Sequence, residues 1–559
     1  MIAKHGWARS IGGSDELETL TSLEQWGRWA ADGRAYNKLP YVRRYALGEG
    51  EDRVLRWQRA WEAASAHAFV LESGKDGRYT FLGLKPTAVI RGTSGEATEA
   101  AAGAEAGNAV SAGDACGRRH EDAPLAVMRE VMARCRAPSV PGAPKFLGGC
   151  VGYWSYDVAR SLERLPELAA NDLGLPDYAF LLVDELWIVD HEARALYLAV
   201  HADVPKEAED ETLRRAMSDA AGRADEMKRI WDRVAAGRAD AAASAAVEAM
   251  KAAMAEDGLE LDVKAFADAG HLRTSMSKEI FKQAVRRIQA YIGQGDVFQV
   301  NLSMRQSMPV AARPEDLYEL LRLINPSPYM GFLKFPDFQL VSASPELLVK
   351  REGDRIGARP IAGTRRRGRT PDEDAAMERE LLASEKERAE HVMLVDLARN
   401  DLGRVAAYGS VRVPELLTVE RYSHVMHLVS QVEGRIAPGW DAFDVLAGSF
   451  PGGTITGAPK IRTMEIIEEL EPVRRGVYTG SLGWIDYAGN MEFNIIIRTM
   501  VAKDGIVHIQ AGAGIVIDSD PEREFYECLN KAKALWKAVQ YGERLRDRKE
   551  PVHLEEGRS

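Results

Sequence analysis

The chain has 559 residues, more than the roughly 250 to 300 at which a single hydrophobic core stops growing, so we expect two domains or one large composite domain. Hydrophobic residues make up 46% and charged residues 28%, which is typical of a folded globular protein and excludes a disordered or fibrous class. The formal net charge is -11, and no lysine and arginine stripe with interleaved aromatic residues occurs, so nucleic acid is not an expected partner.

Neither a membrane segment nor a secretion signal is expected. The first residues lack the apolar segment of a signal peptide, and no uninterrupted run of about 18 apolar residues occurs. Cys116, Cys135, Cys150 and Cys528 are far apart and form no Cys-x-x-Cys pair, which argues against a disulfide framework and a zinc site. We therefore expect a cytoplasmic protein with reduced thiols.

Residues 17–203 are predicted to form an N-terminal region that mixes helices and strands. Segments 78–83 and 180–183 are rich in β-forming residues. Residues 186–189 face 195–198 across a polar turn, as the two strands of a hairpin do.

The next stretches of chain are predicted from composition and helical spacing. Residues 95–122 are rich in Ala, Gly and Ser with little apolar periodicity, which predicts an exposed, mobile insertion. Residues 204–274 have the charged, Ala-rich composition of a helical connector. An N-cap pattern at 275–279 marks the start of a C-terminal domain over 275–543, and the charged residues 544–559 are expected to be a frayed tail.

The C-terminal half alternates strand runs with helices. Residues 331–361 are predicted to form a meander with turns at Pro336-Asp337 and Gly353-Asp354, and residues 476–517 to form three strands. These long hairpins imply a large antiparallel sheet.

Two pairs of carboxylates have the spacing of metal ligands. Glu387 and Glu390 lie three apart in a strongly helical run, and Glu524 and Glu527 repeat the arrangement where another helix begins. If the pairs face one another, they offer the oxygen ligands that Mg²⁺ prefers. The alternative for either pair is an ordinary solvated helix face.

Glycine-rich segments and one histidine are further candidates. Residues 510–516 and 457–460 could bring backbone N–H groups close to a small dicarboxylate, although both could equally be tight turns. His427 lies in an apolar, β-like run, where it is either a general acid or base or a hydrogen-bonded core residue.

Four segments carry a resemblance to known enzymes. They are PIAGTRRRG (360–368), EHVMLVDLARND (390–401), GAPK (457–460) and QAGAG (510–514), in this order. Together they resemble the chorismate-utilising enzymes, and nearly the whole chain is similar to the large subunits of anthranilate synthases. The resemblance implies an α+β fold, with large antiparallel β-sheets in a sandwich-like core and flanking helices.

The resemblance also implies a ligand set. Glu390 and Glu527 would bind Mg²⁺ with Glu387 and Glu524 beside them, and the metal would hold the ring carboxylate of chorismate. The remaining substrate contacts that it implies are Arg498 and Tyr478 for the second carboxylate, Gly363 and Thr364, and backbone donors at Gly512, Ala513 and Gly514. An arginine suits this role because its planar fork matches a carboxylate.

The implied reaction is that of a Mg²⁺-dependent lyase. Chorismate gains ammonia at ring C2, loses its C4 hydroxyl and then eliminates pyruvate to give anthranilate, the first step of tryptophan biosynthesis. Glu346 resembles the acid that assists hydroxyl departure, which requires a raised pKa, and His427 resembles the active-site histidine. Gln299 stands where isochorismate and salicylate synthases carry a water-activating lysine, and Ala362 where aminodeoxychorismate synthases carry a nucleophilic lysine.

Regulation and partners are implied in the same way. Ser73, Pro328, Tyr329 and Met330 resemble contacts of an allosteric site through which tryptophan inhibits the enzyme. Because the chain has no glutaminase motif, a separate glutamine amidotransferase subunit, component II of an anthranilate synthase, would deliver ammonia. Two alternatives stay open: an aminodeoxychorismate synthase component I that works without the lysine, and a non-catalytic tryptophan-binding homologue.

Overall fold

The computed structural model describes residues 17–34, 36–74, 77–102, 117–236, 245, 247–248, 250–252, 272–421 and 425–547. Its helices are α1 (Leu23–Ala30), α2 (Gln58–Ala63), α3 (Pro124–Ala133), α4 (Asp210–Ala236), α7 (Lys278–Gln294), α8 (Pro314–Ile324), α9 (Pro371–Ala383), α10 (Glu385–Gly403), α11 (Ala442–Ser449), α12 (Gly453–Thr456), α13 (Lys460–Leu470), α14 (Pro521–Lys531) and α15 (Lys533–Asp547), with a 3-10 turn over Tyr156–Ser161. None of the helices in these ranges is long and apolar enough to cross a membrane.

The strands in the first half are β1 (Leu17–Thr19), β2 (Lys38–Ala46), β3 (Ala68–Glu72), β4 (Tyr79–Gly83), β5 (Ala88–Gly92), β6 (Ala97–Ala101), β7 (Arg118–His120), β8 (Gly149–Trp154), β9 (Tyr178–Val183), β10 (Glu185–Asp190), β11 (Ala195–Asp203) and β12 (Arg273–Thr274). Those in the second half are β13 (Gln299–Pro309), β14 (Tyr329–Lys334), β15 (Gln339–Ser344), β16 (Leu347–Glu352), β17 (Arg355–Arg359), β18 (Ile361–Arg366), β19 (Arg412–Arg421), β20 (Val425–Arg435), β21 (Gly457–Ala458), β22 (Ser481–Asp486), β23 (Met491–Ile495), β24 (Thr499–Lys503) and β25 (Ile506–Ile515).

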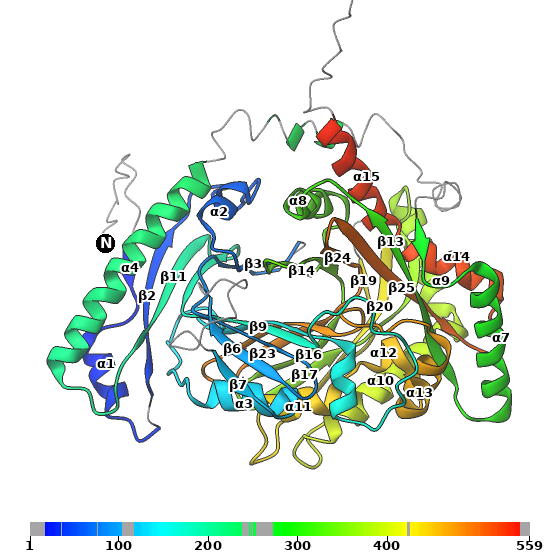
Figure 1. The fold of residues 1–559 in the computed structure, drawn as a ribbon, viewed down its shortest axis with the longest axis horizontal. Coiled ribbons are helices and arrows are strands. Elements are labelled where there is room, and N and C mark those ends of the chain that lie inside the picture. Colours follow the sequence, from blue (N-terminus) through cyan, green and yellow to red (C-terminus); the bar gives the residue numbers. More distant parts are fainter. Residues whose placement is uncertain are drawn as a thin grey trace, which may run out of the picture.

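Two large antiparallel sheets form the centre of the molecule (Figure 1). Within the described residues, sheet A has 13 strands in the order β1-β2-β11-β10-β4-β3-β14-β15-β24-β25-β13-β12, with β21 paired to β13. Sheet B has 12 strands in the order β18-β20-β17-β16-β23-β22-β8-β9-β5-β6-β7, with β19 paired to β20. The hairpin predicted from residues 186–189 and 195–198 is confirmed as β10 and β11, in which Leu186 lies opposite Ala199.

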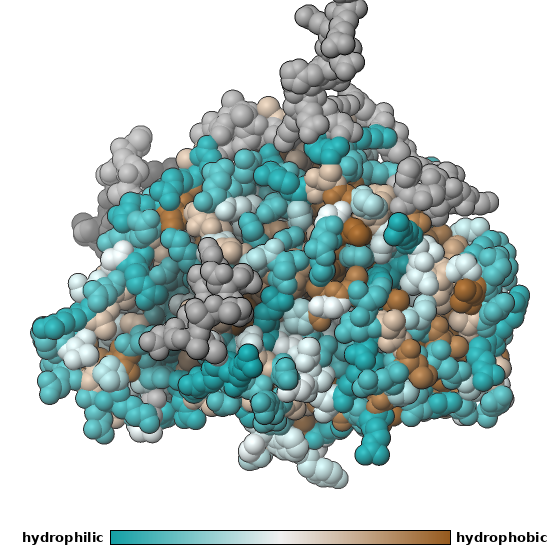
Figure 2. Space-filling model, in the orientation of Figure 1, coloured by the Kyte–Doolittle hydropathy of each residue, from teal (hydrophilic) through white to brown (hydrophobic). Residues whose placement is uncertain are grey.

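The hydrophobic core has three layers. Between the sheets, Phe81 of sheet A packs near Trp484 of sheet B, with ring centroids 6.4 Å apart. The outer face of sheet A is covered by α4, α7, α8, α14 and α15, and the outer face of sheet B by α3, α10 and α11. The predicted sandwich-like core with flanking helices is therefore confirmed, and most of the surface in Figure 2 is hydrophilic because the apolar faces are turned inward.

Strand β9 shows how the sequence builds these layers. Phe180 and Leu182 face the helices outside sheet B, whereas Ala179, Leu181 and Val183 face the layer between the sheets. Successive side chains of a strand point to opposite faces, so a strand covered on both sides is an uninterrupted apolar run.

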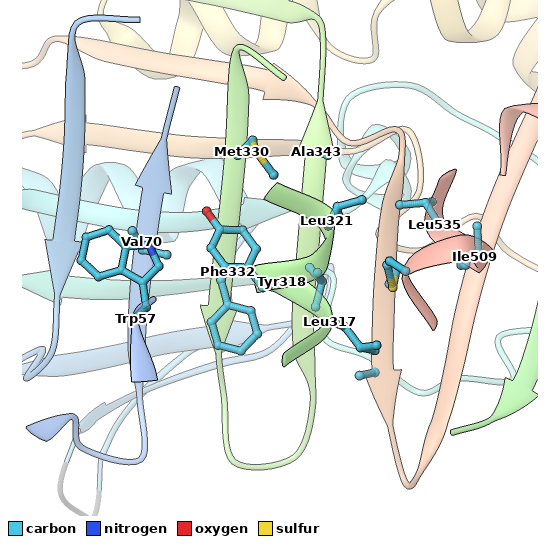
Figure 3. Packing of buried hydrophobic residues seen from close by; sticks show 14 of the residues in the cluster. Trp57, Val70, Leu317, Tyr318, Leu321, Met330, Phe332, Ala343, Ile509 and Leu535 are labelled. Atoms are coloured by element: carbon cyan, nitrogen blue, oxygen red, sulfur yellow. The ribbon is translucent and has the colours of Figure 1, made fainter. Parts of the chain in front are cut away.

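Helix α8 packs on the outer face of sheet A. Tyr318 points from α8 toward Phe332, with ring centroids 5.7 Å apart, whereas Leu317 and Leu321 point toward the side where Leu535 and Ile509 lie (Figure 3). Their spacing of one, three and four residues places them on the inward side of a helix.

Both sheets contain strands from both halves of the chain. In sheet A, β3 pairs with β14, so that Val70 lies opposite Phe332. In sheet B, β8 pairs with β22, so that Val151 lies opposite Trp484. The two regions predicted on either side of residue 275 thus share their sheets, and their independence as folding units stays a prediction.

The predicted hairpins of the second half form, but the chain changes sheet within them. Strands β14 and β15 belong to sheet A and the following β16 and β17 to sheet B, with the crossing at Pro345-Glu346. Residues 476–517 contain four strands and not the predicted three: β22 and β23 lie in sheet B, and β24 and β25 in sheet A. Local turn signals predict hairpins, whereas the sheet that a strand joins depends on distant partners.

Two further predictions need correction and one is confirmed. Residues 95–122 are not wholly an exposed insertion, because β6 and β7 pair with each other and β6 pairs with β5, while residues 103–116 lie outside the described residues. Helix α15 continues to Asp547, past the predicted start of the tail, and the rest of the tail lies outside the described residues. The predicted cap before α7 is confirmed, since Ser277 Oγ accepts a hydrogen bond from Ile280 N at 3.3 Å.

Two of the four sequence motifs meet in a largely buried ion pair. Lys460 of the GAPK segment donates to both carboxylate oxygens of Asp401, at the end of the EHVMLVDLARND segment, at 2.8 Å. Each side chain is 14% exposed. The pair joins α13 to α10.

We expect Lys460→Met to lower the free energy of unfolding by about 3 to 5 kcal/mol, because it leaves the Asp401 carboxylate buried without its partner. The double variant Asp401→Leu with Lys460→Met should recover most of the loss. Urea unfolding measures both, with Lys503→Met of the exposed Lys503–Asp504 pair as control. A loss no larger than that of the control would contradict this role for the pair.

Candidate functional site

The predicted site residues come together around one cavity of about 580 Å³, which we call the central cavity. It lies where β13, β18, β20 and β25 meet α10 and α14. The predicted residues that line it are Gln299, Glu346, Gly363, Thr364, Glu387, Glu390, His427, Tyr478, Arg498, Gly512, Gly514, Glu524 and Glu527. Ala513 lies between two of them on β25, with its side chain in the hydrophobic core.

Glu346 and Arg498 lie at two of the places where the chain crosses between the sheets, β15 to β16 and β23 to β24. The crossings are tied to the neighbouring strands, because Ile495 N donates to Glu346 O at 2.9 Å and Ala343 N donates to Arg498 O at 3.1 Å. Arg498 has φ 50°, a left-handed conformation that is uncommon outside glycine. Such conformations persist where the surrounding structure holds them, often at functional sites.

Glu346 is poised as an acid near neutrality. Burial raises the pKa of its carboxyl from 4.5 to about 7, although Thr454, the Ile361 backbone and the Arg498 charge all act to lower it. A carboxyl that keeps its proton to this pH can donate it to a departing hydroxyl.

His427, on β20, is a neutral imidazole. Burial is the main cause that lowers its pKa to about 4, and the nearby Arg498 charge adds to the effect. Its Nδ1 lies 3.2 Å from Gly363 O and 3.0 Å from Thr364 Oγ1. Because a carbonyl only accepts hydrogen bonds, we assign the proton to Nδ1, which leaves Nε2 with a lone pair to serve as a base.

Glycines let the walls of the cavity approach one another. Gly363 has φ 66° at an irregularity in the pairing of β18 with β20, and this turn aligns Thr364 opposite His427. A Cβ at Gly514 would lie 2.3 Å from Gln299 Nε2, and one at Gly512 would lie 2.4 Å from Asn301 Oδ1. The two side-chain amides of β13 therefore lie directly over the glycines of β25.

The four predicted metal ligands line the same cavity from two helices. Arg365 pairs with Glu387 at 3.0 Å, Lys531 pairs with Glu527 at 2.9 Å, and Gln299 Nε2 lies 3.5 Å from Glu390 Oε1. Burial, followed by the charge of Glu387, raises the pKa of Glu390.

This donor set fits a hard divalent cation. Burial also raises the pKa of Glu524, with the charge of Glu527 adding to it, and a cation would relieve the repulsion within both pairs. No three acidic, His or Cys side chains in the described part of the chain converge on one point. Mg²⁺ commonly takes only one or two carboxylates, with waters and substrate completing its shell, so the arrangement suits it.

The residues predicted to bind tryptophan lie beside two other cavities. Ser73 and Met330 line one of about 670 Å³, next to the pairing of Glu72 with Met330. Pro328 lines another of about 940 Å³, and Tyr329 begins β14 opposite Ser344.

The sequence pattern of the chorismate binding enzymes matches residues 67–537, which is most of the chain. The chain belongs to this family. Among its relatives are anthranilate synthase component 1 of Thermus thermophilus (47% identical; 74% of this chain and 83% of the relative covered) and aminodeoxychorismate synthase component 1 of Bacillus subtilis (43%; 85% and 92%). The crystal structure of anthranilate synthase component I from Streptococcus pneumoniae TIGR4 is similar with a TM-score of 0.65 at 32% identity, over 82% of this chain and 92% of that one.

A second solved structure supports the fold alone. The menaquinone-specific isochorismate synthase MenF from Escherichia coli is 17% identical and has a TM-score of 0.61, over 93% of this chain and 99% of that one. The family match over residues 67–537 and the relatives at 43% and 47% identity confirm the resemblance to chorismate-utilising enzymes drawn from the four motifs.

Several polar residues of the cavity were missed by the sequence reasoning. Lys531 contacts Glu527 and also donates to Gly512 O at 2.9 Å, and its place four residues after Glu527 on one helix could have revealed it. Lys386 and Asn301 also line the cavity. Nothing in their spacing distinguishes them from ordinary surface or strand residues.

Replacing Glu346 by Gln should raise stability at alkaline pH. Below pH 4.5, Glu346 is protonated in both the folded and the unfolded protein. Its favourable contribution to the free energy of unfolding is lost as the pH rises toward and through 7. Between pH 4.5 and about 7, the free energy of unfolding of the wild type should thus fall relative to that of Glu346→Gln by about 1.4 kcal/mol per pH unit, or about 3 kcal/mol in total. Urea unfolding at pH 4, 6 and 8 in EDTA tests this, and parallel pH profiles would contradict it.

Proposed function

We propose that this chain is the large subunit of an anthranilate synthase, a Mg²⁺-dependent lyase that converts chorismate and ammonia to anthranilate and pyruvate. The observation that carries the proposal is the central cavity, which brings a protonated glutamate, a neutral histidine, an arginine and two carboxylate pairs together. The names of relatives at 39% to 48% identity support the choice of reaction.

Each side chain of the cavity has a defined part in this reaction. Arg498 offers a planar fork to one substrate carboxylate, and Tyr478 lines the same cavity. Glu346 donates its proton to the departing hydroxyl, and Nε2 of His427 removes a proton from the ring. Bound Mg²⁺, held by Glu390 and Glu527, would neutralise the other carboxylate and polarise the substrate.

The choice of nucleophile follows from Gln299. Its amide cannot activate water as a basic amine can, so ammonia, which needs no such activation, is the nucleophile that this wall allows. A separate glutamine amidotransferase subunit would supply the ammonia. Tryptophan would inhibit by binding beside Ser73 and Met330 and favouring a less active state.

A second candidate function is aminodeoxychorismate synthase component 1. It is favoured by the 43% identity to the Bacillus subtilis relative of that name. Against it, Ala362 stands at the position of the nucleophilic lysine, and Lys386 and Lys531 of this cavity lie on α10 and α14 beside the carboxylate pairs. The position of the amino group on the product separates the two.

The purified chain should produce anthranilate fluorescence from chorismate, Mg²⁺ and ammonium at alkaline pH. EDTA should abolish the signal because the carboxylate pairs need their cation, and tryptophan should suppress it. A para-amino product would establish the second candidate instead. Tryptophan binding without any chorismate turnover would indicate the non-catalytic homologue.

Replacing His427 by Gln should lower kcat by about 100-fold or more, since it removes the base while leaving the fold intact. His508→Gln is the matched control, because His508 is also buried with a pKa lowered to about 4 and lies outside the lining of the central cavity. Steady-state rates with saturating ammonium measure both variants. Equal effects of the two substitutions would remove His427 from the mechanism.

A further inference from the structure

A second cavity opens beside the central cavity and is larger, at about 940 Å³. We call it the side cavity. The two share part of their walls, since Pro345, Thr364, His427 and Arg498 line both. Helices α14 and α15 form the other wall of the side cavity, and Leu535 of α15 also borders both spaces, near Ile509 of β25 (Figure 3).

The charge of the side cavity is opposite to that of the protein. Its described lining residues include five cations, Arg498, Arg523, Lys531, Lys533 and Lys537, against a single carboxylate, Glu527. The whole chain, in contrast, has a formal net charge of -11.

The lysines of α15 stand on one face of the helix. Lys533, Lys537 and Tyr541 are four residues apart in succession, and all three line the side cavity. Both lysines are half-buried, and the neighbouring wall includes the apolar Leu323 and Ile324. Apolar walls focus the field of such charges into the cavity.

We propose that the side cavity is a capture site for the dianionic substrate, from which it passes to Arg498 and the central cavity. This rests on the proposed function, because the ligand is a small dicarboxylate. Lys533 and Lys537 hold a carboxylate at the entrance through charge alone, and they take no part in the chemistry. Their field acts over about 8 Å at physiological salt, so it is local to the cavity that they line.

The test compares the wild type with a double variant that carries both Lys533→Gln and Lys537→Gln. The matched control is Lys85→Gln with Lys206→Gln, which removes the same charge from two exposed lysines outside both cavities. Calorimetry measures chorismate binding with Mg²⁺ but without ammonia, at low and high salt. Steady-state kinetics with ammonium follows.

The α15 variant should bind chorismate about fivefold more weakly at low ionic strength, with a flatter salt dependence. KM should rise by a similar factor and kcat should stay unchanged. Wild-type affinity in the α15 variant, or an equal loss in the control, would overturn the capture site. If chorismate binding depends on the two lysines but no anthranilate forms, the capture site is supported and the proposed function is contradicted.

Discussion

The paired crossings between the two sheets position the chemistry of this protein. One strand run leaves sheet A through Glu346 while another returns to it through Arg498, and backbone hydrogen bonds of 2.9 and 3.1 Å tie both crossings to neighbouring strands. A side chain at a crossing lies at the end of both sheets and has no cross-strand neighbour on either face. It can therefore point into a cavity, while the strands before and after it stay in the core.

Burial at this place sets the protonation of the acid and the base together. It raises the pKa of Glu346 to about 7 and lowers that of His427 to about 4, because a low-dielectric environment disfavours the charged form of each. The pKa of the glutamate thus lies above that of the histidine, the reverse of their ordinary order. Near neutral pH the glutamate still carries its proton and the histidine lacks its own, so one can donate while the other accepts.

The sequence predicted elements well where the signal is local. Turn residues predicted the β10–β11 hairpin, and Ser277 predicted the start of α7. The sequence did not predict which sheet a strand joins, because that depends on distant strand partners. No residue near Glu346 or Arg498 indicates a change of sheet. The sequence also missed the pairing of the Ala-rich β6 with the short edge strand β7, because neither has the run of large apolar side chains that predicts a strand. The site residues came from the resemblance of four motifs, since spacing alone left both glutamate pairs as possible solvated faces.

On the proposed function, the distribution of charge around the site would let a chain of net charge -11 take an acidic substrate. The carboxylate pairs of α10 and α14 line the central cavity, where a cation would reverse their sign toward the proposed substrate. Arg498 lines both cavities, and the lysines of α15 line the side cavity. A dianion that enters from the α15 side would thus meet an excess of positive charge, with Glu527 as the one carboxylate among the described residues that line the side cavity. On the proposed function, the metal would bind before the substrate, because it cancels the repulsion between the glutamates and an incoming dianion.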